Sequence, residues 1–350
     1  MKGSITLANG TSFAGDWLGD HQYCSGEVVF YTGMTGYEQV LTDPSYQGQI
    51  VVFSYPFIGN YGFMPESMES AQIQVSGVIM ADCYPFQLEG EQHSLTAYLN
   101  HHQIPALTNV DTRALIQQIR KKGSVPAVMH ASTIPSDSFQ LQECWPKTAL
   151  QKFGTGKTHI VLIDFGYKKS IADSLIDQGC TVTVVPFDYE TAEIEKLNPD
   201  GFVFSNGAGD PMRFSKYFSR YKNIAVRYPV LGICLGHQIL ALAFGGETMK
   251  LKFGHRGANH PVMNVKTGKV SMSSQNHSYV VKKESLHSTG FNIWFENVND
   301  KSVEGLWHSQ YDISSVQFHP EAAPGPQEHA QIFQDFIQTV KHKEKVRSYA

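Results

Sequence analysis

The sequence predicts an α/β protein, in which a mixed-β amino-terminal domain precedes a domain with a mainly parallel sheet flanked by helices. Two observations predict this fold. Up to about residue 130, short runs rich in β-branched and aromatic residues are separated by turn-forming residues, which is typical of strands. From residue 159 onward, apolar strands alternate with helical patterns, the order expected for parallel strands joined by crossover helices. A chain of 350 residues is long enough for about two domains.

The composition narrows the class of protein. Hydrophobic residues make up 41% and charged residues 17% of the chain, as in soluble globular proteins. A net charge of -4 gives no basic surplus for nucleic acid or an anionic membrane, so we expect neither as a partner. The amino-terminal residues lack the apolar core of a signal peptide. Five scattered cysteines and 15 histidines show no metal-ligand spacing, so we expect a cytoplasmic protein with reduced thiols and no metal site.

The first domain is expected to contain a hairpin around Asn9-Gly10, strands near 26–31, 49–54 and 75–80, and helices near 94–101 and 111–123. Residues 33–49 (GMTGYEQVLTDPSYQGQ) are polar and turn-rich, and we expect a functional loop there. Composition shifts to turn formers after residue 132. We therefore predict domains at 1–135 and 158–350, with a linker at 136–157. Residues 154–158 (GTGKT) lack the first glycine of a phosphate loop and precede a strand, which excludes a nucleotide site there.

The second domain is expected to have strands near 159–164, 181–187, 201–205, 230 and 313–318, and helices near 168–178, 211–221, 234–244 and 328–341, with β structure from 247 to about 309. In open parallel sheets, ligands bind at the carboxyl ends of the strands. Residues 205–211 (SNGAGDP) and 232–236 (GICLG) both lie at such ends.

Cys234 is the first candidate catalytic residue, because it stands between Gly232 and Gly236 where a strand turns sharply into a helix. Glycines permit a tight turn that presents the side chain at the helix N-terminus, where the dipole favours a thiolate. A lone cysteine is more commonly a small, inert core residue. His319, which directly follows the last strand, can take the thiol proton, and Glu321 can orient that imidazole. The three residues together therefore favour nucleophilic catalysis by cysteine.

These motifs resemble class I (triad type) glutamine amidotransferases over about residues 158–342, through GICLGHQ at 232–238 and QFHPE at 317–321. The resemblance extends to the small-subunit family of carbamoyl-phosphate synthetases over nearly the whole chain. It is carried by GYEQVLTDPSYQGQI, YPFIGNYG and NVDTRALI in the first half, and by SNGAGDP, KFGHRGANHPV, SQNHSYVV and HPEAAPGP in the second.

The resemblance implies a role for each matching residue. Cys234 would attack the side-chain amide of L-glutamine, His319 would act as acid and base, and Glu321 would be its partner. The backbone N–H groups of Leu235 and Gly207 would form the oxyanion hole. The remaining residues implied to bind glutamine are Ser45, Gly209, Gln238, Asn276, Ser278 and Tyr279. Ser278 stands where the family usually has glycine; it can serve through its backbone if its φ is negative, whereas a positive φ would be strained.

The resemblance also implies a partner: a large ATP-dependent synthetase subunit that receives ammonia and makes carbamoyl phosphate for arginine or pyrimidine biosynthesis. No cofactor is expected in this chain, and ATP and magnesium are expected on the partner. Two other hypotheses remain open, namely an amidotransferase that serves another acceptor, and a non-catalytic regulatory subunit that has kept the fold.

Overall fold

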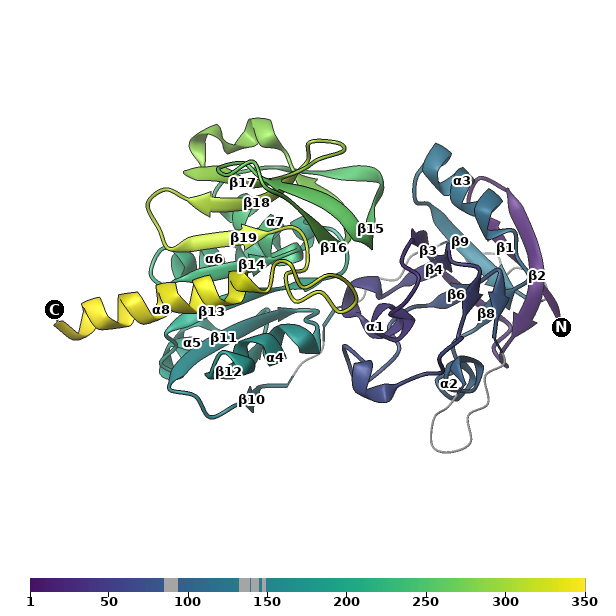
Figure 1. Ribbon diagram of the computed structural model, residues 1–350, viewed down its shortest axis with the longest axis horizontal. Helices are drawn as coiled ribbons and strands as arrows, with labels where there is room; N and C mark the ends of the chain where they lie inside the picture. Colours follow the sequence, from purple (N-terminus) through teal and green to yellow (C-terminus); the bar gives the residue numbers. More distant parts are fainter. Residues whose placement is uncertain (85–93, 132–138, 140–144, 147–148, 350) are drawn as a thin grey trace. The chain divides into compact units, whose positions relative to one another are not determined.

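We analysed a computed structural model that describes residues 1–84, 94–131, 139, 145–146 and 149–349, with side chains described up to residue 343. The chain forms two compact units (Figure 1). One comprises Met1–Cys144 with Lys252–Gly257, and the other Trp145–Leu251 with Ala258–Ala350. Part of the predicted linker, including residues 136–138 and Cys144, lies outside the described residues, so the predicted domain boundaries stay a prediction.

The first unit is built on a closed barrel with the strand order β1-β2-β8-β6-β4-β3-β9. Its strands are β1 (Lys2–Leu7), β2 (Ser12–Leu18), β3 (Tyr23–Tyr31), β4 (Gln49–Phe53), β6 (Gly77–Ile79), β8 (Ala106–Thr108) and β9 (Pro126–His130), and β5 (Phe57–Ile58) pairs separately with β7 (Asp82–Cys83). The helices are α1 (Tyr37–Thr42), α2 (Leu95–His101) and α3 (Thr112–Lys122), with short 3₁₀ turns at Pro44–Tyr46 and Pro65–Ser67. The expected hairpin forms between β1 and β2, where Gly10 has a φ of 85°.

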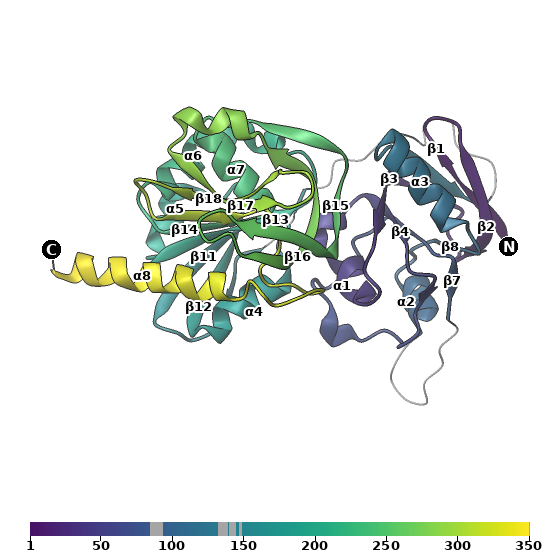
Figure 2. The ribbon, with the colours of Figure 1, turned by 45° about the horizontal axis from the view of Figure 1, so that its top comes forward.

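Helices α2 and α3 begin at the capping residues that the sequence predicts. Ser94 caps α2 by accepting a hydrogen bond from the Ala97 N–H, and Asp111 caps α3 in the same way. Figure 2 shows α3 beside the barrel strands, where Leu115 and Ile119 join the buried cluster formed by inward-facing strand residues.

The expectation of a polar loop at 33–49 was wrong in one respect. Residues 37–42 form helix α1, and most of its side chains are buried. Tyr37 and Leu41 pack into an apolar cluster with α2 and the barrel strands, so burial of this face outweighs the turn-forming composition around it.

The second unit contains a ten-stranded sheet with the order β10-β12-β11-β13-β14-β19-β18-β17-β15-β16. Its strands are β10 (Gln151–Phe153), β11 (Thr158–Phe165), β12 (Cys180–Pro186), β13 (Gly201–Gly207), β14 (Val230–Ile233), β15 (Thr248–Asn264), β16 (Val270–Val281), β17 (Phe291–Asn297), β18 (Val303–His308) and β19 (Ile313–Val316). Strands β12, β11, β13, β14 and β19 are mutually parallel, and the remaining pairings recorded for this sheet are antiparallel. The mainly parallel core of the sheet confirms the predicted fold class.

Helices cover both faces of the parallel strands (Figure 1). They are α4 (Lys169–Asp177), α5 (Thr191–Lys196), α6 (Phe218–Ala225), α7 (Leu235–Ala243) and α8 (Gln331–Tyr349), with 3₁₀ turns at Pro211–Tyr217 and Lys283–Ser288. Helices α4 and α8 share one apolar cluster, and α5, α6 and α7 share the other. The single helix expected at 211–221 is instead a 3₁₀ turn followed by α6. None of the helices in the described part of the chain is long and apolar enough to cross a membrane.

Candidate active site

The turn between β14 and α7 presents Cys234 in an unusual backbone conformation. Its φ is 53° and its ψ -102°, a region that residues with a Cβ rarely adopt. The Cys234 N–H donates to the carbonyl of Val316 on β19 at 2.8 Å, which fixes the turn to the neighbouring strand. The thiol therefore sits at the N-terminus of α7, as the glycine spacing predicts.

Close approaches at the two glycines of this turn leave little room for a side chain. A Cβ on Gly236 would lie 2.1 Å from the carbonyl oxygen of Phe204, and one on Gly232 would lie 2.6 Å from Cδ1 of Leu240. Side chains at either position would push α7 away from β13 and β14. The glycines thus hold the first turn of the helix against the sheet, and the position of the thiol follows from that packing.

His319 and Glu321 follow β19 and face one another. Nδ1 of His319 lies 2.6 Å from Oε1 of Glu321, and both side chains are buried. The His319 N–H donates to the carbonyl of Ser274 on β16, so the backbone at the histidine is fixed to a second strand. The carboxylate accepts at Nδ1 and leaves Nε2 as the nitrogen available for proton transfer.

Lys168 completes this charged group, although the sequence pattern does not predict a role for it. Its Nζ donates to Oε1 of Glu321 at 3.0 Å and to the carbonyl of Ala322 at 2.7 Å, and its side chain is only 2% exposed. The backbone of Lys168 is held by Asn206, whose Oδ1 accepts from the lysine N–H at 3.0 Å. Lys168 and Glu321 are 153 residues apart. The only local signal is the placement of a lysine at the carboxyl end of a predicted strand.

The buried charges set the protonation states of this pair. Burial lowers the pKa of His319, but the charge of Glu321 and the interaction with Cys234 outweigh it and raise that pKa to about 10. Burial raises the pKa of Glu321, but the charges of Lys168 and then His319 lower it to about 2. Glu321 is therefore ionised at neutral pH, and its charge makes His319 a strong acceptor for the proton of Cys234.

The thiol of Cys234 lies among polar neighbours from β16 and from the segment that follows β19. Its Sγ is 3.5 Å from the carbonyl oxygen of Asn276 and 3.7 Å from Nε2 of Gln317. Within the described residues, Nε2 of His319 is buried without a hydrogen-bond partner, yet Cys234 is near enough to affect its pKa. Catalytic hydrogen bonds are often long before substrate binds and shorten in the complex. The structure thus brings together the three residues that the sequence predicts as catalytic.

Gly207 and Leu235, whose N–H groups are the predicted oxyanion donors, lie next to one another. A Cβ on Gly207, the last residue of β13, would lie 2.0 Å from the carbonyl oxygen of Phe165 and 2.9 Å from Cδ2 of Leu235. Gly207 must therefore be glycine, and its backbone adjoins the first residue of α7. The N–H groups in the first turn of a helix have no acceptor within the helix. Gly209, two residues on, has a φ of 91° and needs glycine for that reason.

Of the other predicted glutamine-binding residues, Asn276, Ser278 and Tyr279 lie on β16. The carbonyl of Tyr279 accepts from Nε2 of Gln238 at 2.8 Å, and its hydroxyl donates to Asp210 at 3.2 Å. These bonds tie β16 to α7 and to the loop after β13. Ser278 is not among the residues with positive φ, so serine is tolerated here without backbone strain.

Ser45 belongs to the barrel unit. It lies in the 3₁₀ turn Pro44–Tyr46, where its N–H donates to Oδ1 of Asp43 at 2.8 Å, and it is buried. Its part in glutamine binding stays a prediction.

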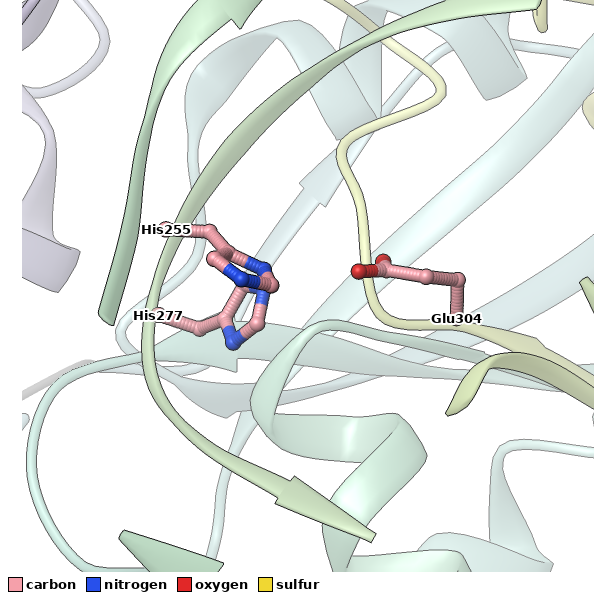
Figure 3. A group of neighbouring side chains, drawn as sticks. All are labelled: His255, His277 and Glu304. Carbon is pink, nitrogen blue, oxygen red and sulfur yellow. The ribbon is translucent and has the colours of Figure 1, made fainter. Parts of the chain in front are cut away.

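His277 has structural hydrogen bonds at both ring nitrogens. Nδ1 lies 2.8 Å from the carbonyl of Tyr279, and Nε2 lies 2.9 Å from Oε1 of Gln275. The amide nitrogen of Gln275 donates to Glu304 at 3.0 Å, so one glutamine side chain links the imidazole and the carboxylate. Figure 3 shows the Glu304 carboxylate pointing toward the His277 ring. The bonds at both nitrogens give His277 a structural role.

Comparison with known protein families identifies the class of protein to which the second unit is similar. Residues 161–339 match the family described as glutamine amidotransferase class-I, and this segment holds Cys234, His319 and Glu321. Residues 5–129 match a second family, carbamoyl-phosphate synthase small chain, CPSase domain.

Curated relatives extend over the whole chain. The carbamoyl phosphate synthase arginine-specific small chain of Bacillus subtilis (strain 168) is 51% identical over 345 residues, which cover 97% of each chain. The protein of the same name from Halalkalibacterium halodurans is 46% identical over 100% of both chains. The carbamoyl phosphate synthase small chain of Listeria innocua is 41% identical over 100% of this chain and 99% of its own. The chain belongs to the carbamoyl phosphate synthase small chain family.

Proposed function

We propose that this chain hydrolyses glutamine at Cys234 and supplies the ammonia to a large subunit for carbamoyl phosphate synthesis. The observation that carries the proposal is the buried array in which Glu321 holds His319 beside the Cys234 thiol. Family membership supports the same assignment, because the segment matching class-I glutamine amidotransferases contains all three residues.

In this reaction His319 takes the thiol proton of Cys234, and the thiolate attacks the side-chain carbonyl carbon of glutamine. The proton then passes to the amide nitrogen, the C–N bond breaks, and ammonia leaves a γ-glutamyl thioester on the sulfur. Water next attacks the thioester and gives its proton to His319. The C–S bond breaks and glutamate is released with the thiolate restored.

The negative oxygen formed in both steps needs hydrogen-bond donors. We assign this role to the backbone N–H groups of Leu235 and Gly207, whose residues adjoin one another in the structure. A donor of this kind contributes about 3 kcal/mol to the transition state. Gly209, Gln238, Asn276, Ser278 and Tyr279 are proposed to hold the rest of the glutamine.

The partner in this proposal is a large ATP-dependent subunit. The relatives are named as small chains, which supports a second, larger chain in the complex. ATP and magnesium would act on that chain, and no cofactor is assigned to this one. We place the protein in the cytoplasm without nucleic acid or membrane partners, in keeping with its composition. Two relatives at 46–51% identity are named arginine-specific, which favours arginine over pyrimidine biosynthesis as the destination of the product.

Two measurements test this function. Purification of the tagged chain from its own cells should recover a large polypeptide that binds ATP, and the complex should release glutamate from glutamine. Acid quenching during turnover with labelled glutamine should leave label on the peptide containing Cys234. A complex that releases no glutamate would favour a regulatory subunit. A partner that carries another acceptor chemistry would favour a different amidotransferase.

A further inference from the structure

The sulfur of Cys234 is contacted by the side chain of Gln317, an uncharged residue that is fully buried. Gln317 follows β19 directly, two residues before His319, and is 0% exposed. Its backbone N–H donates to the carbonyl of Glu304 at 2.9 Å, and its Nε2 lies 3.7 Å from Cys234 Sγ. The sulfur also lies 3.5 Å from the carbonyl oxygen of Asn276, so a donor and an acceptor both contact it.

The surrounding hydrogen bonds fix which end of the Gln317 amide faces the sulfur. The carbonyl of Tyr279 can only accept, so the Gln238 atom 2.8 Å from it must be Nε2. The same Nε2 lies 2.9 Å from the Gln317 amide and must meet its oxygen there. The nitrogen of Gln317 is therefore directed at Sγ. A backbone carbonyl thus determines the orientation of two successive side-chain amides.

We propose that Gln317 is a further catalytic residue whose amide N–H stabilises the Cys234 thiolate. Gln238 is then a positioning residue that holds the Gln317 amide with its nitrogen directed at Sγ. This role rests on the proposed glutamine hydrolysis. A thiolate accepts a hydrogen bond more strongly than a thiol, so the Gln317 bond strengthens as the proton moves from Sγ to His319. It strengthens again when the C–S bond of the thioester breaks and the electron pair returns to sulfur.

The geometry gives Gln238 a task in addition to contact with substrate. Its amide nitrogen is already bonded to Tyr279 and Gln317. A contact with glutamine through this side chain would therefore use Oε1. Removal of Gln238 should then affect the reactivity of the free thiol, which a residue that only bound substrate would not do.

Alkylation of the full-length chain by iodoacetamide tests this inference without glutamine or a partner. The rate at Cys234 is followed against pH by mass spectrometry of its peptide, which separates it from the other cysteines. The midpoint of the profile reports thiolate formation and does not depend on how often reagent reaches the buried sulfur. Gln317→Leu should move the midpoint upward by about half to one pH unit, which is about 3- to 10-fold less thiolate at a given pH below it.

Further variants separate the two roles. Gln317→Glu keeps the oxygen that faces Gln238 but places a carboxylate oxygen at the sulfur, and should move the midpoint at least as far as Gln317→Leu. Gln238→Leu should produce a smaller upward shift, and the double variant Gln238→Leu/Gln317→Leu should not exceed Gln317→Leu alone. Gln310→Leu removes an exposed amide and is the matched control, with no shift expected.

Circular dichroism and thermal melting identify the variants that remain folded. Folded Gln317→Leu or Gln317→Glu with the wild-type midpoint would overturn the role of Gln317. Fully additive shifts in the double variant would overturn the positioning role of Gln238. A chain that never hydrolyses glutamine but shows these shifts would overturn the proposed function alone, so the two failures are distinguishable.

Discussion

The two reacting side chains of this site are held by different forces. Cys234 is placed by close packing at Gly232 and Gly236, and in the described part of the chain its sulfur has hydrogen-bond contacts to neutral groups of Asn276 and Gln317. His319 is instead held by buried charge, through Glu321 and Lys168. Removing one partner of a buried charge pair strongly destabilises a protein, because the other charge is left unpaired. Losing a neutral contact costs less stability, and amide and carbonyl groups do not titrate. The charged side should therefore respond to pH and to single substitutions more strongly.

The largest effect is expected from Glu321→Gln, which removes the charge that holds His319. Without it, the imidazole loses both its orientation and its raised pKa. Glutaminase turnover of the complex should fall by about 10³- to 10⁴-fold, as when the orienting carboxylate of a triad is neutralised. Glu284→Gln, on an exposed 3₁₀ turn, is the control. If turnover of Glu321→Gln stayed within tenfold of wild type, the charge of Glu321 would not be what holds His319 in place.

Lys168→Met should have the next largest effect. It removes the charge beside Glu321 and leaves the carbonyl of Ala322 without its lysine donor. We expect turnover to fall by about 10- to 100-fold, because a buried carboxylate loses one of its two charge partners. The adjacent Lys169→Met is a close control, because Lys169 is an exposed helix residue paired with Asp173. Equal effects of both substitutions would contradict the assignment of Lys168.

The placement of Cys234 can be tested through the packing of the glycine turn that precedes α7. Gly236→Ala would place a Cβ 2.1 Å from the Phe204 carbonyl and should destabilise the protein by about 2–4 kcal/mol in urea unfolding. Gly179→Ala meets nothing within 4 Å but has a φ of 76°, so it should cost only about 1 kcal/mol. The difference between the two separates a steric contact from backbone strain. Equal costs would mean that the turn before α7 is less closely packed than described.

The smallest expected effect is a pH dependence of stability. The pKa of His319 is raised from 6.5 to about 10, so its contribution is complete below pH 6.5 and is lost as the pH rises through about 10. The pKa of Glu321 is lowered from 4.5 to about 2, so its contribution is present above pH 4.5 and is lost as the pH falls toward 2. The stability difference between wild type and Glu321→Gln, measured by urea unfolding, should shrink steadily from pH 6 to pH 9. A constant difference would contradict the charged pair.

The same contrast explains what the sequence could predict. Cys234 lies between glycines at a strand–helix junction, and His319 and Glu321 are two residues apart after a strand, so local pattern identifies all three. Lys168 and Gln317 reach the site only through tertiary contacts, 153 residues from Glu321 and 83 from Cys234. Their local sequence gives at most their place near the carboxyl end of a strand, which does not reveal what their side chains contact. Local pattern also missed helix α1, because burial of its apolar face decides its structure.

The central claim is that Cys234 makes ammonia for a partner and is not needed for what the partner does with it. The decisive measurement is carbamoyl phosphate synthesis by the complex containing Cys234→Ser, with glutamine or with ammonium chloride as the nitrogen source. We predict that glutamine-dependent synthesis falls below about 10⁻³ of wild type, while ammonia-dependent synthesis stays within about twofold. Equal loss of both activities, or retained use of glutamine, would contradict the account.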